Sequence, residues 1–93
     1  MQLLQGVDHF YSGDYVSAIE NLQAYSRTGT VKQPLARFYL GAAKLARFFV
    51  TGAEDATLHQ EALNDLKVAK QAGFKPTPDL SPKILQAYQD LSF

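Results

Sequence analysis

The segment from Pro34 to Val50 constrains the fold of this chain more than any other feature. Its apolar residues lie almost all round a helical projection, and a helix of that kind has to be enclosed by other helices. The charged residues of the segment are Arg37, Lys44 and Arg47. They share one wedge narrower than about 90° when successive residues turn by about 100°. The sequence therefore predicts a central helix with a single polar window.

Other parts of the chain also carry apolar residues at helical spacing, and no part reads as a strand. The breaks between these segments are short, so consecutive helices are expected to be antiparallel neighbours. The length of 93 residues corresponds to one domain. We expect an all-α fold of five helices, with a hairpin at 2–27, a hairpin at 34–72 that has an extended exposed turn at 51–56, and a capping helix at 82–91.

Several predicted helix ends carry suitable capping residues. Asp14 is a good N-cap because its side chain accepts a backbone N–H and its charge suits the positive end of the helix dipole. Thr57 and Gln60 have the spacing of a capping box, in which the two residues satisfy each other's free amides. Gly73 stands where a left-handed C-terminal cap is expected, and Phe74 follows as the apolar residue that folds back. Caps and apolar stripes therefore agree on helices.

Composition argues against several classes of function. The chain has no cysteine, which removes disulfides, thiolate nucleophiles and cysteine metal sites. No apolar run approaches the ~20 residues that span a bilayer, and no signal peptide is visible. His9 and His59 lack partners at metal-ligand spacing, and the chain has no Gly-rich phosphate loop. We expect no enzyme activity, no metal and no cofactor. The cytoplasm is the favoured location, with export as part of a longer protein left open.

Charge is distributed unevenly although the formal net charge is zero. Between Asn21 and Ala53 the chain has five basic residues and no acidic one. In one interpretation, Arg37, Lys44 and Arg47 form the solvent window of the central helix, with their aliphatic stems lying on aromatic rings. In the other, they anchor acidic side chains or a carboxylate of a partner. Nucleic acid is disfavoured as a partner, because so few phosphate contacts give little affinity at physiological salt.

Two stretches of the chain share a repeated pattern. Gly6 and Gly41 are small residues at which a second helix can approach closely, and they are 35 positions apart. The stretch Ala18-Ile19-x-x-Leu22 corresponds to Ala62-Leu63-x-x-Leu66. With these residues the chain resembles the tetratricopeptide repeat (TPR) family over nearly its whole length, as about two and a half degenerate repeats. The resemblance implies helical hairpins stacked in a short right-handed array, in a domain that stands alone or is excised from a longer protein.

The resemblance further implies a concave groove that binds a peptide or a partner helix. Carried over to this sequence, the apolar lining of the groove is Leu3, Val7, Phe10, Phe38, Ala42, Leu45 and Phe49, and its basic rim is Arg37, Lys44 and Arg47. We therefore expect a non-catalytic protein-interaction module, a scaffold or adaptor whose partner is a protein or peptide. The alternative is a self-assembly domain, in which the apolar face meets a second copy. Another part of a longer protein is a further candidate to fill the groove.

Overall fold

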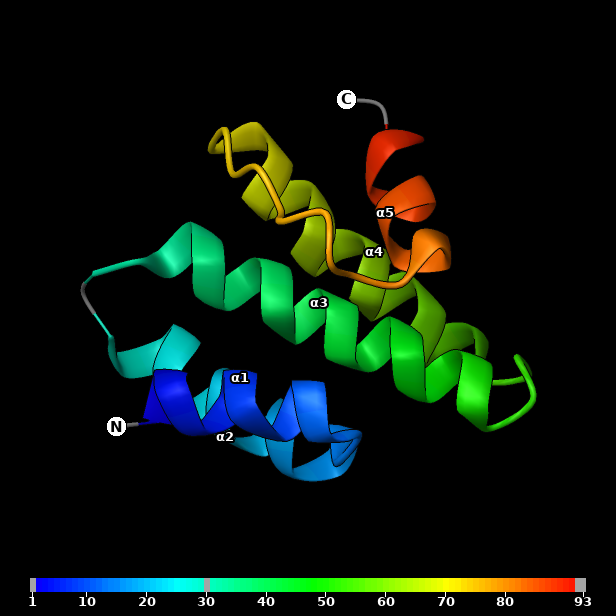
Figure 1. Cartoon of the computed structure of the whole chain (residues 1–93), viewed down its shortest axis with the longest axis horizontal. Coiled ribbons are helices and arrows are strands. Elements are labelled where there is room, and N and C mark those ends of the chain that lie inside the picture. The colour runs from blue at the N-terminus through cyan, green and yellow to red at the C-terminus, as the bar shows by residue number, and fades with distance from the viewer. Residues whose placement is uncertain (1, 30, 92–93) are drawn as a thin grey trace.

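The computed structural model describes residues 2–29 and 31–91 of the chain. This part contains helices, turns and extended connections, and no strand. Figure 1 shows the helices in chain order, which are α1 (Gln2–Ser12), α2 (Tyr15–Thr28), α3 (Gln33–Val50), α4 (Ala56–Gln71) and α5 (Pro82–Gln89). The all-α prediction is confirmed.

The last helix is shorter than predicted. It ends at Gln89 rather than at residue 91. Its last turn tightens, with the backbone N–H of Leu91 donating to the Tyr88 carbonyl at 3.3 Å, and the Lys70 side chain donates to the carbonyls of Tyr88 and Gln89, at 3.1 and 3.0 Å. These carbonyls are among those that a helix leaves unpaired at its C-terminus, where a cation is also favoured by the helix dipole.

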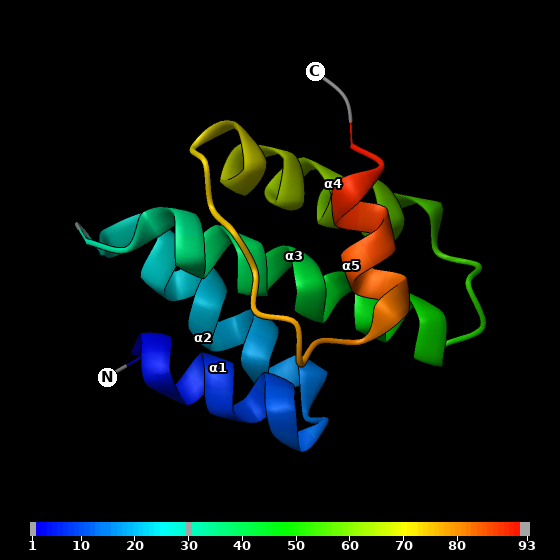
Figure 2. The ribbon, with the colours of Figure 1, turned by 45° about the horizontal axis from the view of Figure 1, so that its top comes forward.

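α3 lies at the centre of the molecule, as its apolar circumference predicts. α2 and α4 pack along its length, and α1 and α5 also contact it (Figure 1). Nine successive residues, Phe38–Ala46, are buried. Residues 72–81 connect α4 to α5 as a long segment, which crosses α3 in Figure 2. The elements around α3 therefore cover it on every side over these residues.

Two acidic residues cap helix N-termini. Asp14 Oδ1 accepts the backbone N–H of Ser17 at 3.2 Å, which confirms the predicted cap of α2. The hydrogen bonds from the Ser17 side chain and backbone hold the pKa of the Asp14 carboxyl below its usual value. Asp14 therefore stays ionised at neutral pH, in the form that suits the helix N-terminus.

The predicted capping box at α4 is wrong. The N-cap is Asp55, whose Oδ1 accepts the backbone N–H of Leu58 at 3.0 Å. Thr57 lies inside the first turn, and Gln60 donates a hydrogen bond to Asn64 instead. The physical reason is that aspartate is the stronger N-cap, and it carries a charge that the helix dipole favours. The helix therefore begins earlier than the Thr-x-x-Gln pattern indicates.

The C-terminus of α4 matches its prediction. Gly73 has a φ of +84°, a conformation that glycine adopts without steric cost. The backbone N–H groups of Gly73 and Phe74 donate to the carbonyls of Lys70 and Ala69, each at 3.0 Å, in the pattern of a Schellman motif. The motif turns the chain so that the ring of Phe74 lies 4.9 Å from the ring of Phe38 on α3.

The two helical hairpins repeat one close contact. A Cβ atom placed on Gly6 of α1 would lie 2.5 Å from Cγ of Leu22 on α2. A Cβ atom placed on Gly41 of α3 would lie 2.8 Å from Cγ of Leu66 on α4, and 2.9 Å from both the Ala62 carbonyl oxygen and the Leu66 backbone nitrogen. These glycines therefore allow the approach that their positions in the sequence predict. The second approach is the closer one, because it brings two backbones together.

We predict that Gly41→Ala lowers the free energy of unfolding by about 2 kcal/mol, because the added methyl group collides with the α4 backbone. This loss remains after the gain of about 1 kcal/mol that alanine brings to a helix interior. Gly6→Ala is the matched comparison. Its methyl group meets only the Leu22 side chain, which can move, so its loss should be smaller. Urea unfolding of both variants measures the difference, and an equal or larger loss for Gly6→Ala would contradict this account.

Candidate interaction surface

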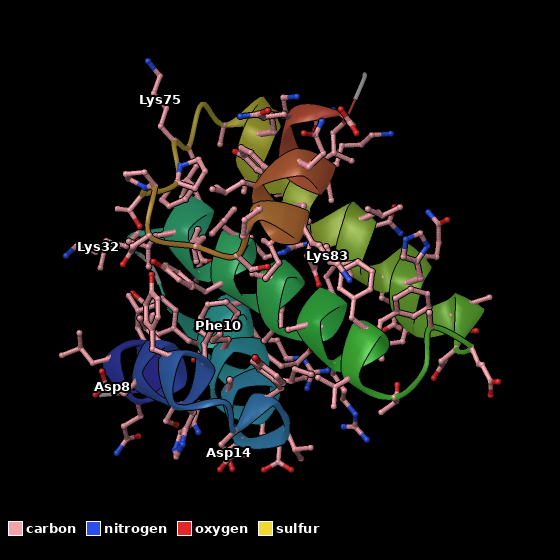
Figure 3. All side chains as sticks on the ribbon, turned by 45° about the vertical axis from the view of Figure 1, so that its right-hand side comes forward. Asp8, Phe10, Asp14, Lys32, Lys75 and Lys83 are labelled. Atoms are coloured by element: carbon pink, nitrogen blue, oxygen red, sulfur yellow. The ribbon has the colours of Figure 1, made fainter. Side chains whose placement is uncertain are left out.

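Most of the predicted groove lining is part of the hydrophobic core. The buried residues among those seven are Leu3, Phe10, Phe38, Ala42 and Leu45. Figure 3 shows Phe10 pointing inward from α1. These residues are therefore not an open lining in this structure, which corrects the expectation. The physical reason is that hairpins in so small a domain share one core, so their apolar stripes face each other and the segment that follows α4.

The other two predicted groove residues reach the surface. Val7 is half-buried and packs against the core. Phe49 is 38% exposed near the end of α3, where its ring contacts Phe48 and lies 5.2 Å from Nζ of Lys83 on α5. The predicted lining is therefore divided between α1 and the far end of α3.

An exposed apolar strip runs along α1, and we define it as Leu4, Val7 and Tyr11. Leu4 is 61% exposed and Tyr11 is 48% exposed. Because these positions follow the spacing i, i+3 and i+7, they lie on one face of the helix. Leu4 and Tyr11 were not predicted as surface residues. Helical spacing could have indicated their exposure, because they project to one side of the helix face that carries Leu3 and Phe10.

The α1 strip is connected to the middle of α3 through tyrosine. The hydroxyls of Tyr11 and Tyr39 are 2.9 Å apart and share a hydrogen bond, and their rings pack edge to face. Burial, together with Tyr11, raises the pKa of Tyr39 above the ordinary value for tyrosine. Tyr39 therefore stays a neutral hydrogen-bonding group between α1 and α3.

Arg37 and Lys44 do not form a basic rim, because both bind Asp65 of α4. Nε and Nη2 of Arg37 lie 3.1 and 2.9 Å from Oδ1 of Asp65, and Nζ of Lys44 lies 2.8 Å from Oδ2. Lys44 is buried. The polar window of α3 therefore faces α4 rather than solvent. This outcome corrects the prediction of a solvent window and of a basic anchor at these two residues.

Spacing explains why one carboxylate meets both cations. Arg37 and Lys44 are seven residues apart, which is about two helical turns on one face. Asp65 lies opposite them, on the face where α4 approaches Gly41. A buried charge is tolerated when it is paired, so the ion pairs make this polar face compatible with the core. Asp65 was not among the predicted site residues. Its position between Ala62 and Ala69 in the apolar stripe of α4 is nevertheless that of a residue facing the core.

Arg47, the third predicted rim residue, remains exposed. It lines an open hollow of about 630 Å³ at the end of the α3–α4 hairpin. The other residues around the hollow are Thr51, Glu54, Asp55, Thr57, Leu58 and Glu61. Since three of them are carboxylates, Arg47 stands in acidic surroundings. A single cation there is a poor anchor for an acidic partner.

The two histidines make contacts within the domain. Nδ1 of His9 lies 3.6 Å from Oδ2 of Asp14, and both side chains are exposed. The ring of His59 packs on the ring of Phe48, with 4.6 Å between centroids. Across residues 2–29 and 31–91, no group of three or more histidine, aspartate or glutamate residues is arranged to hold a metal ion.

Comparisons of the chain with protein-family models, with curated proteins and with solved structures gave no match. None of the described helices combines the length and apolar character that crossing a membrane requires. The class that the structure defines is a compact all-α domain of two helical hairpins and a short final helix. Its function has to be argued from the exposed surface and from what covers α3.

We predict that Asp65→Ala lowers the free energy of unfolding by about 3 kcal/mol, because it leaves Lys44 buried without its closest partner. Glu61→Ala is the matched control. Glu61 also contacts Lys44, at 3.4 Å, but its side chain is 54% exposed against 9% for Asp65. The control should cost less than about 1 kcal/mol. Urea unfolding tests both variants, and equal losses would show that burial does not set the strength of these pairs.

Proposed function

We propose that the chain is a non-catalytic, TPR-like protein-interaction module that binds a peptide or a partner helix on the α1 strip. The observation that carries the proposal is the exposure of Leu4 and Tyr11 on one face of a helix whose opposite face is buried. The glycine–leucine contact that recurs in both hairpins supports the TPR-like character. The α1 strip thus retains Val7 from the lining that the sequence predicts, with Leu4 and Tyr11 in place of the residues that are buried.

α1 is held firmly enough to act as a preformed binding surface. Leu3 and Phe10 anchor its inner face in the core, and Gly6 packs against α2. The hydrogen bond between Tyr11 and Tyr39 ties its end to α3. A preorganised surface leaves most of the ordering cost to the partner. An apolar strip with an exposed tyrosine suits an amphipathic helix or an extended apolar segment, since tyrosine offers both a ring and a hydroxyl.

Self-assembly is the second candidate function. Val31 before α3 and Val50 at its end are 62% and 72% exposed, so apolar groups are also present away from α1. Two copies could bury these residues against each other. Light-scattering mass measured over a hundredfold range of concentration separates the candidates. A monomer throughout favours the interaction module, and a dimer that forms as concentration rises favours self-assembly.

The proposed function is tested by selecting peptides from a displayed random library on the immobilised full chain. We predict that the selected peptides carry apolar or aromatic residues, and that Leu4→Glu weakens their binding at least about tenfold by placing a charge in the strip. Val16→Glu is the matched control, because Val16 is 47% exposed on the neighbouring helix α2.

Circular dichroism establishes that both variants are folded, as expected for substitutions at exposed positions. Peptides that bind the Leu4→Glu and Val16→Glu variants equally well would contradict the assignment of the α1 strip. A selection that yields no binding peptide would contradict the proposed function itself.

A further inference from the structure

The α3 face that the sequence assigned to a groove is covered by the chain's own C-terminal part. We call residues 72–81 the strap, and the strap together with α5 the cover. The Phe38 ring lies 4.9 Å from the ring of Phe74 in the strap and 5.1 Å from the ring of Tyr88 in α5. Leu80 and Ile84 of the cover are also buried. Figure 2 shows the strap crossing α3 before α5 begins.

The covered face of α3 is apolar along its length. Phe38, Ala42, Leu45 and Phe49 follow the spacing i, i+4, i+7 and i+11, which places them on one side of the helix. The strap covers this side at Phe38, and Lys83 of α5 lies over the Phe49 ring. Two of the residues predicted to bind a partner, Phe38 and Phe49, therefore contact a segment of the same chain instead.

Beyond the Schellman motif, in which Gly73 and Phe74 bond to the end of α4, side chains rather than backbone hydrogen bonds attach the cover to the helices. In the part of the chain that the structure describes, no backbone hydrogen bond joins residues 75–80 to a helix. The Tyr88 hydroxyl donates to the Phe74 carbonyl at 2.5 Å, which ties α5 to the strap and not to the hairpins. Lys70 of α4 binds carbonyls at the end of α5, including that of Leu91 at 2.8 Å. These few attachments allow the cover to leave as one unit.

α5 depends on this docking for its own stability. It has 8 residues, and Ser81 at its N-cap makes no side-chain capping hydrogen bond. Isolated helices shorter than about 12 residues are marginal in water, so α5 should lose its helical structure when it leaves α3. Segments held by few contacts open at a lower free energy than the whole domain. The cover is therefore the part of the fold expected to open first.

The cover also borders a hollow that is open to the surface. An open hollow of about 560 Å³ lies beside the strap and α5. The apolar residues around it are Phe74, Pro76, Pro78, Leu85 and Tyr88, and the other lining residues are Lys70, Gly73, Lys75 and Gln89. The residues that line the hollow belong to the strap, to α5 and to the end of α4, so the hollow lies beside the covered face of α3 rather than on it.

We propose that the α3 face is a second peptide-binding groove, which the cover occupies until a partner segment displaces it. The partner is an extended peptide with an aromatic residue and, six positions later, a leucine, matching Phe74 and Leu80, followed by a short amphipathic helix. The proposal rests on the proposed protein-interaction function and names its partner. Tyr39, beside Phe38 on α3, bonds to Tyr11 of the α1 strip, so a hydrogen bond links the two proposed binding surfaces.

Competition between cover and partner gives the proposal a measurable consequence. A partner can bind the α3 face only in the fraction of molecules whose cover is open, so its apparent affinity is reduced by that fraction. A substitution that weakens the cover and leaves α3 unchanged should therefore raise the affinity. The same substitution in a permanently packed helix would only destabilise the domain.

The test uses a fluorescently labelled synthetic peptide with the sequence of residues 73–91, titrated with the full chain and followed by anisotropy. Tyr88→Ala in the chain weakens the cover by removing the ring from Phe38. We predict that this variant binds the peptide at least about tenfold more tightly than the unaltered chain. Gln86→Ala is the matched control, because Gln86 is exposed on the same helix and its side chain bonds to the exposed Asp90, and it should bind like the unaltered chain.

Adding Phe38→Ala to Tyr88→Ala should abolish the gain, because it removes the anchor for the aromatic residue of the peptide. Circular dichroism checks that each variant is folded. Tyr88→Phe removes only the hydroxyl bond to Phe74, so we expect a smaller gain in peptide affinity than for Tyr88→Ala. Folded variants that bind no more tightly than the unaltered chain would overturn the proposal. So would a Phe38-dependent dimer seen by light scattering, since the occupant would then be a second copy.

These results are independent of the α1 strip. Loss of selected peptides in Leu4→Glu concerns the proposed function, whereas the gain in Tyr88→Ala concerns the cover. If the cover variants fail while the Leu4-dependent peptides bind, the module stands and this second groove does not.

Discussion

The structure depends on the close approach of α3 and α4 at Gly41, where a single methyl group would collide with the Ala62 carbonyl and the Leu66 nitrogen. Because the two backbones come so near, Asp65 can reach both Arg37 and Lys44 of α3. The ion pairs in turn let a helix with two cations on one side be enclosed. Without this approach, the polar face of α3 would have to turn toward solvent and the other helices would have to be arranged differently.

Because α3 is enclosed by the other elements, few of its surfaces are accessible to a partner. One side of α3 is taken by α4 and others by α1 and α2, so only the side under the cover can be freed without separating the hairpins. The α1 strip is exposed from the outset, and it is joined to the covered side through Tyr11 and Tyr39. In our proposal, the domain has one permanent contact surface and one that depends on the release of its own segment.

Local rules predicted much of the fold from the sequence. The central position of α3 follows from its apolar circumference, and the caps at Asp14 and Gly73 follow from side-chain chemistry and φ preferences within one turn. The candidate site was predicted less well, because the contacts that bury its predicted residues are made by distant parts of the chain. Arg37 meets Asp65 over a separation of 28 residues, and Phe38 meets Phe74 and Tyr88 only after the strap has crossed α3.

The central claim is that the cover opens while the hairpins stay folded, and native-state hydrogen exchange in increasing low concentrations of urea tests it most directly. The account predicts that the amides of Leu85 in α5 and of Asp90 at its C-cap exchange through an opening of lower free energy and weaker urea dependence than the amides of buried α3. If the α5 and α3 amides exchange with the same free energy and the same urea dependence, the cover and the hairpins open together. That result would contradict a displaceable cover.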